Sequence, residues 1–195
     1  MILFKELDYS NIIGHHFLVY GETNTGKTQF TANFVKYLIE SKNIDPKEIT
    51  ILEFGPKFKI INNFKTGGRI QDYYFKSLLC INISTEGEII PPRINARTKE
   101  ELYENICHNY KKTSNMLTLY SKNPTPYLII NDISIYLHLG SKYELITVLN
   151  KSNTFLGNSY YGKSIKSTIS KLLSLIEKKK IEFLIKNIEF SVFSG

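Results

Sequence analysis

Residues 14–39, "GHHFLVYGETNTGKTQFTANFVKYLI", decide the fold of this chain. Residues 16–20 are a short apolar run of strand-forming types. The apolar residues after the glycines recur at helical spacing instead, as Phe30, Phe34, Val35 and Leu38. Between the two segments, Gly21 and Gly26 let successive backbone N–H groups point at one anion. A helix that begins near Lys27 directs the positive end of its dipole to the same point, so we expect an anion-binding loop.

The spacing of Gly21, Gly26, Lys27 and Thr28 matches the phosphate-binding P-loop, G-x-x-x-x-G-K-[ST]. Lys27 is then a catalytic residue that reaches the β- and γ-phosphates, and the Thr28 hydroxyl is a Mg²⁺ ligand. The alternative is a glycine-containing turn with a solvated lysine. We predict that a nucleoside triphosphate and Mg²⁺ bind here, with nucleotide contacts from Gly21, Glu22, Thr23, Asn24, Thr25, Gly26, Lys27, Thr28 and Gln29.

Composition sets the broad class of the protein. A length of 195 residues suits one domain, residues 1–195, with a hydrophobic core of ordinary size. Cys80 and Cys107 have no motif spacing and are typical of reduced thiols in a cytoplasmic protein. The sequence has neither the pattern of a signal peptide nor an apolar run of membrane-spanning length. We therefore expect a cytoplasmic location and no membrane partner.

The charge of the chain leaves a nucleic-acid partner open. The net charge is +7 and the pI is about 9.2, which suits an acidic partner. The lysines are spread along the whole sequence, however, and this distribution favours a solvated surface over a dedicated nucleic-acid site.

Apolar strand-like runs alternate with helical patterns along the chain, which predicts a mostly parallel α/β sheet with helices on both faces. The expected strands are residues 16–20, 49–54, 77–83, 127–131 and 154–157. The expected helices follow the P-loop and span residues 98–120, 141–151 and 164–180, with Thr98 as an N-cap. Residues 182–185 and 188–193 read as final strands that could form an antiparallel hairpin.

Two acidic residues stand where strands end. Asp132 follows the apolar strand "YLIIN", and we assign it to the Mg²⁺ shell, with Asn131 left as a water or phosphate contact. Glu53 ends the strand "ITILE" before Gly55, and we predict that it is the catalytic base for the attacking water. The alternatives are an ordinary polar turn for residues 131–132 and an outward-facing glutamate at position 53.

The order of these motifs resembles the RecA/KaiC group of P-loop ATPases over residues 14–162. The resemblance rests on the P-loop, Glu53, "LIIND" at 128–132 and "TFLGNSYYG" at 154–162. It implies a three-layer sheet of RecA-like type, Asp132 in the metal shell and Asn158 as a sensor of the γ-phosphate. The sequence departs from the group where Gly55 follows Glu53 and where the interval between the P-loop and Asp132 is long.

The chain has three arginines, Arg69, Arg93 and Arg97, and all lie in that long interval. Because a guanidinium grips phosphate in a planar, bidentate way, one of them could act across a subunit boundary in a homo-oligomer. The alternative is three structural or surface arginines. Tyr160 or Tyr161 could stack on a base, although packing at the end of the core is the more ordinary role.

Three functions are consistent with the sequence. The first is a Mg²⁺-dependent ATPase of RecA/KaiC type that couples its nucleotide state to a partner or an oligomer. The second is a nucleotide-gated binding module with little hydrolysis. The third is a small-molecule phosphotransferase in which arginines of the long interval grip an acceptor.

Overall fold

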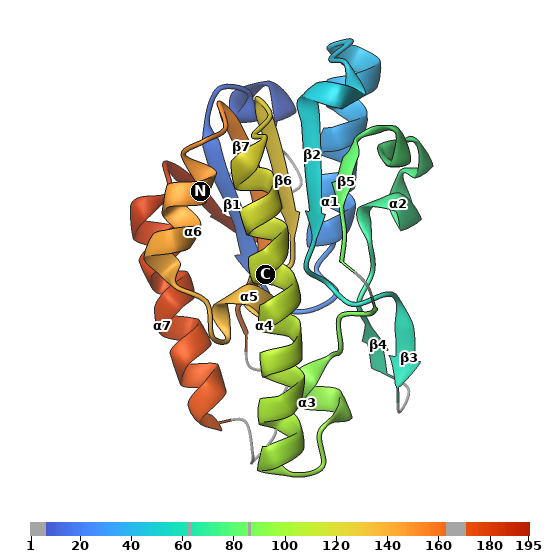
Figure 1. Ribbon diagram of the computed structural model, residues 1–195. Helices are drawn as coiled ribbons and strands as arrows, with labels where there is room; N and C mark the ends of the chain where they lie inside the picture. The colour runs from blue at the N-terminus through green and yellow to red at the C-terminus, as the bar shows by residue number, and fades with distance from the viewer. Residues whose placement is uncertain (1–6, 62–63, 86, 163–170) are drawn as a thin grey trace.

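The computed structural model describes residues 7–61, 64–85, 87–162 and 171–195, with the backbone alone for residues 59–61 and 64–66. Six strands form a central sheet, and helices cover both of its faces (Figure 1). This arrangement confirms the predicted three-layer α/β fold.

The central sheet is parallel throughout. Its strands, in order, are β5 (Ile81–Ile83), β2 (Ile49–Glu53), β6 (Tyr127–Asn131), β7 (Thr154–Tyr160), β1 (His16–Gly21) and β8 (Phe190–Phe193). A separate antiparallel pair consists of β3 (Lys59–Ile61) and β4 (Phe64–Thr66). Because every strand of the central sheet points the same way, the carboxyl ends of β1, β2, β6 and β7 meet at one edge.

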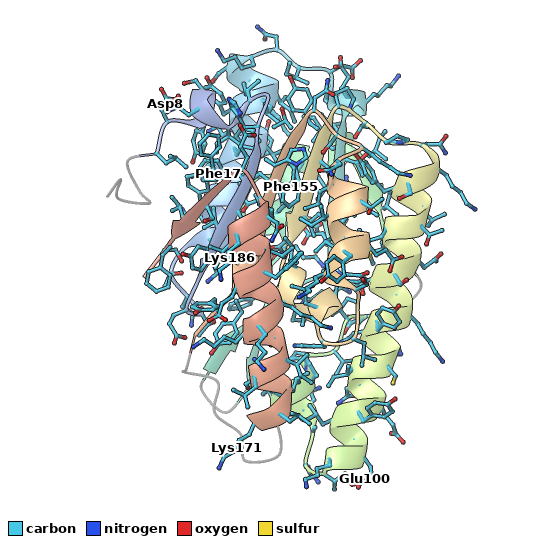
Figure 2. The ribbon with its side chains drawn as sticks, turned by 90° about the vertical axis from the view of Figure 1, so that its left-hand side faces the viewer. Asp8, Phe17, Glu100, Phe155, Lys171 and Lys186 are labelled. Atoms are coloured by element: carbon cyan, nitrogen blue, oxygen red, sulfur yellow. The ribbon has the colours of Figure 1, made fainter. Side chains whose placement is uncertain are left out.

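Two helical layers enclose the sheet. One layer contains α4 (Lys99–Lys122), α5 (Ile133–Leu137), α6 (Lys142–Leu149) and α7 (Lys171–Asn187). The other contains α1 (Lys27–Lys36) and α2 (Ile70–Tyr73). The short helix α3 (Pro92–Asn95) directly precedes α4. Figure 2 shows Glu100 and Lys171, near the starts of α4 and α7, at the same end of the molecule, far from Asp8.

Side chains alternate between two cores because successive residues of a strand point to opposite faces. On β6, Leu128 and Ile130 pack with α4 to α7, whereas Ile129 packs with α1 and α2. On β1, Leu18 and Val19 divide in the same way. Burial on both faces explains why these strands read as continuous apolar runs in the sequence.

The prediction of a C-terminal hairpin over residues 182–193 is wrong. Residues 182–187 belong to α7, and β8 pairs with β1 in parallel. Leu173, Ile181 and Leu184 are buried at helical spacing, and this period overrides the strand-forming types of residues 182–185. Residues 164–170 of the predicted helix lie outside the described residues.

The strand expected at residues 77–83 is shorter in the structure. Residues 75–79 form a 3₁₀ helix, and only Ile81–Ile83 pair with β2.

The start predicted for the long helix is confirmed, since the Thr98 hydroxyl accepts the Glu101 N–H at 3.2 Å. The side chain of Glu101 binds the backbone N–H of Arg97 rather than that of Thr98.

Within the part of the chain that the structure describes, no helix combines the length and the apolar character that crossing a membrane requires.

Candidate functional site

A cavity of about 160 Å³ opens at the carboxyl edge of the sheet, large enough for a chemical group rather than a single water. Its lining comes from the P-loop, from the ends of β6 and β7, from the segments after β2 and β4, and from α2, α3 and α5. The lining side chains include Lys27, Thr28, Asp132, Asn158, Arg93 and His138. Segments far apart in the sequence therefore meet where the parallel strands end.

The P-loop has the backbone geometry of an anion site. Gly26 caps α1 at φ 85°, a left-handed conformation that a side chain would strain. Among the described residues no side chain caps the start of α1, and the first turn of α1 contains no acidic residue. A Cβ at Gly21 would clash with the Ser194 hydroxyl. The first N–H groups and the helix dipole thus remain directed at an incoming anion.

Lys27 is 8% exposed and folds back on its own loop. Its ammonium donates hydrogen bonds to the Glu22 carbonyl and, at 3.2 Å, to the Thr25 hydroxyl. Burial lowers the pKa of Lys27 to about 8, although the charges of Asp132 and Glu22 oppose this shift. A phosphate in the cavity would add negative charge beside this buried cation.

Asn131, at the end of β6, is the hub of the hydrogen bonds behind the cavity. Its amide oxygen accepts the Thr28 hydroxyl at 3.2 Å and the Asn158 amide at 2.9 Å. Its amide nitrogen donates to Glu53 at 2.7 Å and to the Gly68 carbonyl at 2.8 Å. One buried side chain therefore joins the P-loop to the ends of β2 and β7.

Asp132 lies beside the cavity in a constrained backbone conformation. Its φ of 61° is left-handed, a state that costs on the order of 1–3 kcal/mol outside glycine. Its N–H donates to the Asn158 amide oxygen at 3.0 Å, and its carboxylate accepts the Ser134 hydroxyl at 2.6 Å. Burial raises the pKa of Asp132, and the charge of Glu177 adds to this, while Ser134 and Lys27 act against it. The structure thus holds a buried carboxyl group at the cavity.

Glu53 ends β2 as expected, but it does not line the cavity. One carboxylate oxygen accepts the Ile70 N–H at 2.7 Å, and the other accepts the Asn131 amide at 2.7 Å. Burial raises its pKa to about 7, although these two hydrogen bonds and Arg69 oppose the shift. The Glu53 carboxylate therefore contacts the Ile70 N–H and the Asn131 amide rather than the cavity.

The structure brings most of the predicted site residues together. Those that line the cavity are Thr23, Asn24, Thr25, Gly26, Lys27, Thr28, Arg93, Asn131, Asp132, Asn158 and Tyr160. Gly21, Glu22, Gln29 and Glu53 do not line it, and Gln29 is exposed.

Several lining residues carried no signal in the sequence. They are Gly55, Pro56, Gly67, Gly68, Tyr73, Pro91, Pro92, Ile94, Ser134, Ile135 and His138. Their shared property is a position beyond the carboxyl end of a strand, which only the strand order reveals. The paired prolines and glycines marked turns in the sequence, but they did not identify a cavity wall.

The donor groups fit a Mg²⁺ ion that arrives with a nucleotide. The Thr28 hydroxyl and the Asp132 carboxylate both line the cavity. Among the described residues no cluster of three His, Cys, Asp or Glu side chains could hold a metal without further ligands. Mg²⁺ typically takes one or two protein carboxylates and completes its shell with phosphate oxygens and waters. Thr28 and Asp132 would hold it in this way.

The fold and the loop define the class of the protein. A parallel sheet with helices on both faces, and a P-loop between β1 and α1, is the P-loop NTPase fold. No protein-family model and no curated protein sequence matches the chain.

Solved structures that are similar to this chain include the Pif1 helicase from Candida albicans (14% identity, TM-score 0.38), the Hef helicase domain from Pyrococcus furiosus (11%, 0.40) and Drosophila ORC bound to GC-rich DNA and Cdc6 (13%, 0.32). The matches cover 99%, 99% and 96% of this chain, but only 39%, 37% and 52% of those chains. These values are too low to carry a functional argument, so the class rests on the geometry above.

Proposed function

We propose that this protein binds ATP with Mg²⁺ in the cavity at the P-loop and hydrolyses it. The observation that carries the proposal is the shared cavity of Lys27, the uncapped start of α1 and the Asp132 carboxylate. A buried ammonium and free helix N–H groups favour the β- and γ-phosphates. A bound Mg²⁺ would neutralise charge that develops on the phosphates.

Hydrolysis requires an attacking water and a group that accepts its proton. The water oxygen bonds to the γ-phosphorus while the bond to the β–γ bridging oxygen breaks, and the products are ADP and phosphate. Asp132 is a carboxylate at the cavity, whereas both oxygens of Glu53 contact protein donors. We therefore propose that Asp132, which would also hold the Mg²⁺, orients the reacting water, that the proton of this water passes to an oxygen of the released phosphate, and that Glu53 has a positioning role through Asn131.

The proposed coupling follows the RecA/KaiC type. Asn158 lines the cavity. Its amide oxygen accepts a hydrogen bond from the Asp132 N–H, and its amide nitrogen donates to the Asn131 amide oxygen and to the Thr31 hydroxyl. Loss of the γ-phosphate would therefore change hydrogen bonds that reach β6, β7 and α1 together. We propose that this change is read by a partner or by another copy of the chain, with DNA as the first partner to test.

A nucleotide-gated binding module with little hydrolysis is the second candidate. The contacts of Glu53 favour it, because the predicted base is held away from the cavity by Ile70 and Asn131.

Phosphate release from ATP with Mg²⁺ tests both candidates. The proteins compared are the wild type, Lys27→Ala, Asp132→Asn and Glu53→Gln, with and without DNA. The control is Lys36→Ala, at the exposed far end of α1. We expect Lys27→Ala and Asp132→Asn to lose about 100-fold or more of the turnover, and Lys36→Ala to match the wild type.

Two outcomes change the conclusion. Unaltered turnover in Lys27→Ala would contradict hydrolysis at this site. Tight ATP binding without turnover in the wild type, with and without DNA, would make the chain a nucleotide-gated module.

A further inference from the structure

Three charged or titratable side chains meet at the cavity wall away from the P-loop sequence. Glu177 of α7 binds Arg93 of α3 through one carboxylate oxygen. The same oxygen lies 3.1 Å from Nε2 of His138, at the end of α5. The side chains of Arg93, Glu177 and His138 are only 6%, 4% and 3% exposed, respectively. The Arg93 guanidinium also lies 5.6 Å from the centre of the Tyr160 ring.

This cluster is incompletely satisfied. Nε of Arg93 and Nδ1 of His138 are buried and have no hydrogen-bond partner among the described residues. Buried polar atoms without a hydrogen-bond partner are rare in folded proteins. A guanidinium has five N–H donors, and here a single carboxylate oxygen serves both it and His138. At least one donor of Arg93 therefore lacks an acceptor within the part of the chain that the structure describes.

Arg93 and His138 line the same cavity as Lys27 and Thr28. Arg69 and Arg97 do not, and Arg97 is exposed. A guanidinium is a planar donor that suits phosphate oxygens, and stacking on an aromatic ring fixes its plane. The cavity thus has a second cationic group besides Lys27, contributed by the same chain rather than by a neighbouring subunit.

We propose that Arg93 forms a second phosphate-binding subsite in the cavity, which takes a phosphoryl group whose oxygens replace Glu177 on the guanidinium. This inference rests on the proposed function, because a nucleotide enters the same cavity. The phosphoryl group has two sources: the γ-phosphate of the bound nucleotide, or a separate phosphorylated molecule beside a bound diphosphate.

Glu177 has a defined part in this subsite. Its carboxylate orients Arg93 in the empty cavity and competes with the incoming anion for the same donors. Because Glu177 belongs to α7, its displacement connects occupancy of the cavity to that helix. Glu177→Gln removes the competing charge and is expected to bind phosphate more tightly than the wild type.

Calorimetric titration of three ligands tests the subsite. The ligands are Mg·ATP, Mg·ADP and inorganic phosphate, the last added to protein saturated with Mg·ADP. The proteins are the wild type, Arg93→Gln, Glu177→Gln and the control Arg97→Gln, an exposed arginine four positions along the chain. The ratio of the ATP and ADP dissociation constants is taken within each variant, so that a general loss of stability cancels.

We expect one of two patterns. If the subsite holds the γ-phosphate, Arg93→Gln lowers the preference for ATP over ADP by about tenfold, or about 1.4 kcal/mol. If the subsite holds a separate molecule, Arg93→Gln leaves the ratio of the ATP and ADP dissociation constants unchanged and lowers the affinity for inorganic phosphate about tenfold. In both patterns Arg97→Gln matches the wild type. An Arg93→Gln protein that keeps the wild-type ratio and the wild-type phosphate affinity would overturn the subsite.

A second variant and a rule for the case without nucleotide binding complete the test. If Arg93→Gln does not fold, Arg93→Met combined with Glu177→Met removes both buried charges and is titrated in the same way. If the wild type binds neither nucleotide, the proposed function fails. The subsite is then judged from inorganic phosphate alone, and it fails as well unless phosphate binds and Arg93→Gln weakens that binding about tenfold.

Discussion

Replacing Glu53 by glutamine should change how the free energy of unfolding depends on pH. Burial raises the pKa of Glu53 from 4.5 to about 7 in the folded protein. The folded state therefore holds this proton more tightly than the unfolded chain does. As the pH rises from 4.5 to 7, the unfolded chain ionises first, and the folded state loses stability relative to it.

The size of this loss follows from the shift in pKa. The difference between about 7 and 4.5 is roughly 2.5 units, and each unit is worth 1.36 kcal/mol, which gives about 3 kcal/mol. The stability is fully present below pH 4.5, falls between pH 4.5 and 7, and is constant above that range. Glutamine does not ionise, so Glu53→Gln lacks this contribution.

Urea unfolding without nucleotide, at intervals from pH 4.5 to 8, measures the effect. Wild type should lose about 3 kcal/mol more than Glu53→Gln across that range. Glu48→Gln, an exposed residue just before the same strand, should follow the wild type. Parallel curves for the wild type and Glu53→Gln would refute the buried, proton-holding environment that the structure gives to Glu53.

Three substitutions test other parts of the structure. Asn131→Ala removes the buried hydrogen bonds to Asn158 and to the Gly68 carbonyl, so chemical unfolding should show a loss of about 2–4 kcal/mol; a loss under about 0.5 kcal/mol would mean that Asn131 is not the hub of these hydrogen bonds. Gly26→Ala places a side chain at φ 85°, so we expect a loss of about 1–2 kcal/mol and weaker ATP binding in the same assays, whereas an unchanged protein would contradict the left-handed cap. Ile181→Ala empties a fully buried site of α7 and should cost about 2–4 kcal/mol in thermal or urea unfolding, against less than about 0.5 kcal/mol for the more exposed Ile176→Ala, and equal losses would argue against the helix that replaces the expected strand.

Local sequence patterns predicted the framework of the site. The P-loop, the strand before it and the helix after it depend on neighbouring residues, since glycine conformations and helical spacing are short-range properties. Asp132 could be placed because parallel strands bring their carboxyl ends to one edge, whereas Asn158 followed from the resemblance to the RecA/KaiC group. The end of the chain misled us because residues 182–185 favour strands by type, and only burial against the sheet shows their helical period.

The remainder of the site depends on long-range packing. His138 and Glu177 are 39 positions apart and come together only when α5 and α7 pack. Arg93 was a candidate because arginines are rare in this chain, but its position in the chain's own cavity depends on α3 and β7. The sequence predicted Asn131 only as a water or phosphate contact, because a sequence does not show which strand-end residue faces the P-loop threonine Thr28.

Titration of the wild type and Lys27→Ala with Mg·ATP tests the central claim most directly, with Lys36→Ala as the matched lysine control on the same helix. The account predicts saturable, one-to-one binding by the wild type and Lys36→Ala, and binding at least tenfold weaker by Lys27→Ala, since it loses a buried charge-assisted contact to phosphate. No binding by the wild type, or equal binding by all three proteins, would contradict the assignment of this cavity as a nucleotide site.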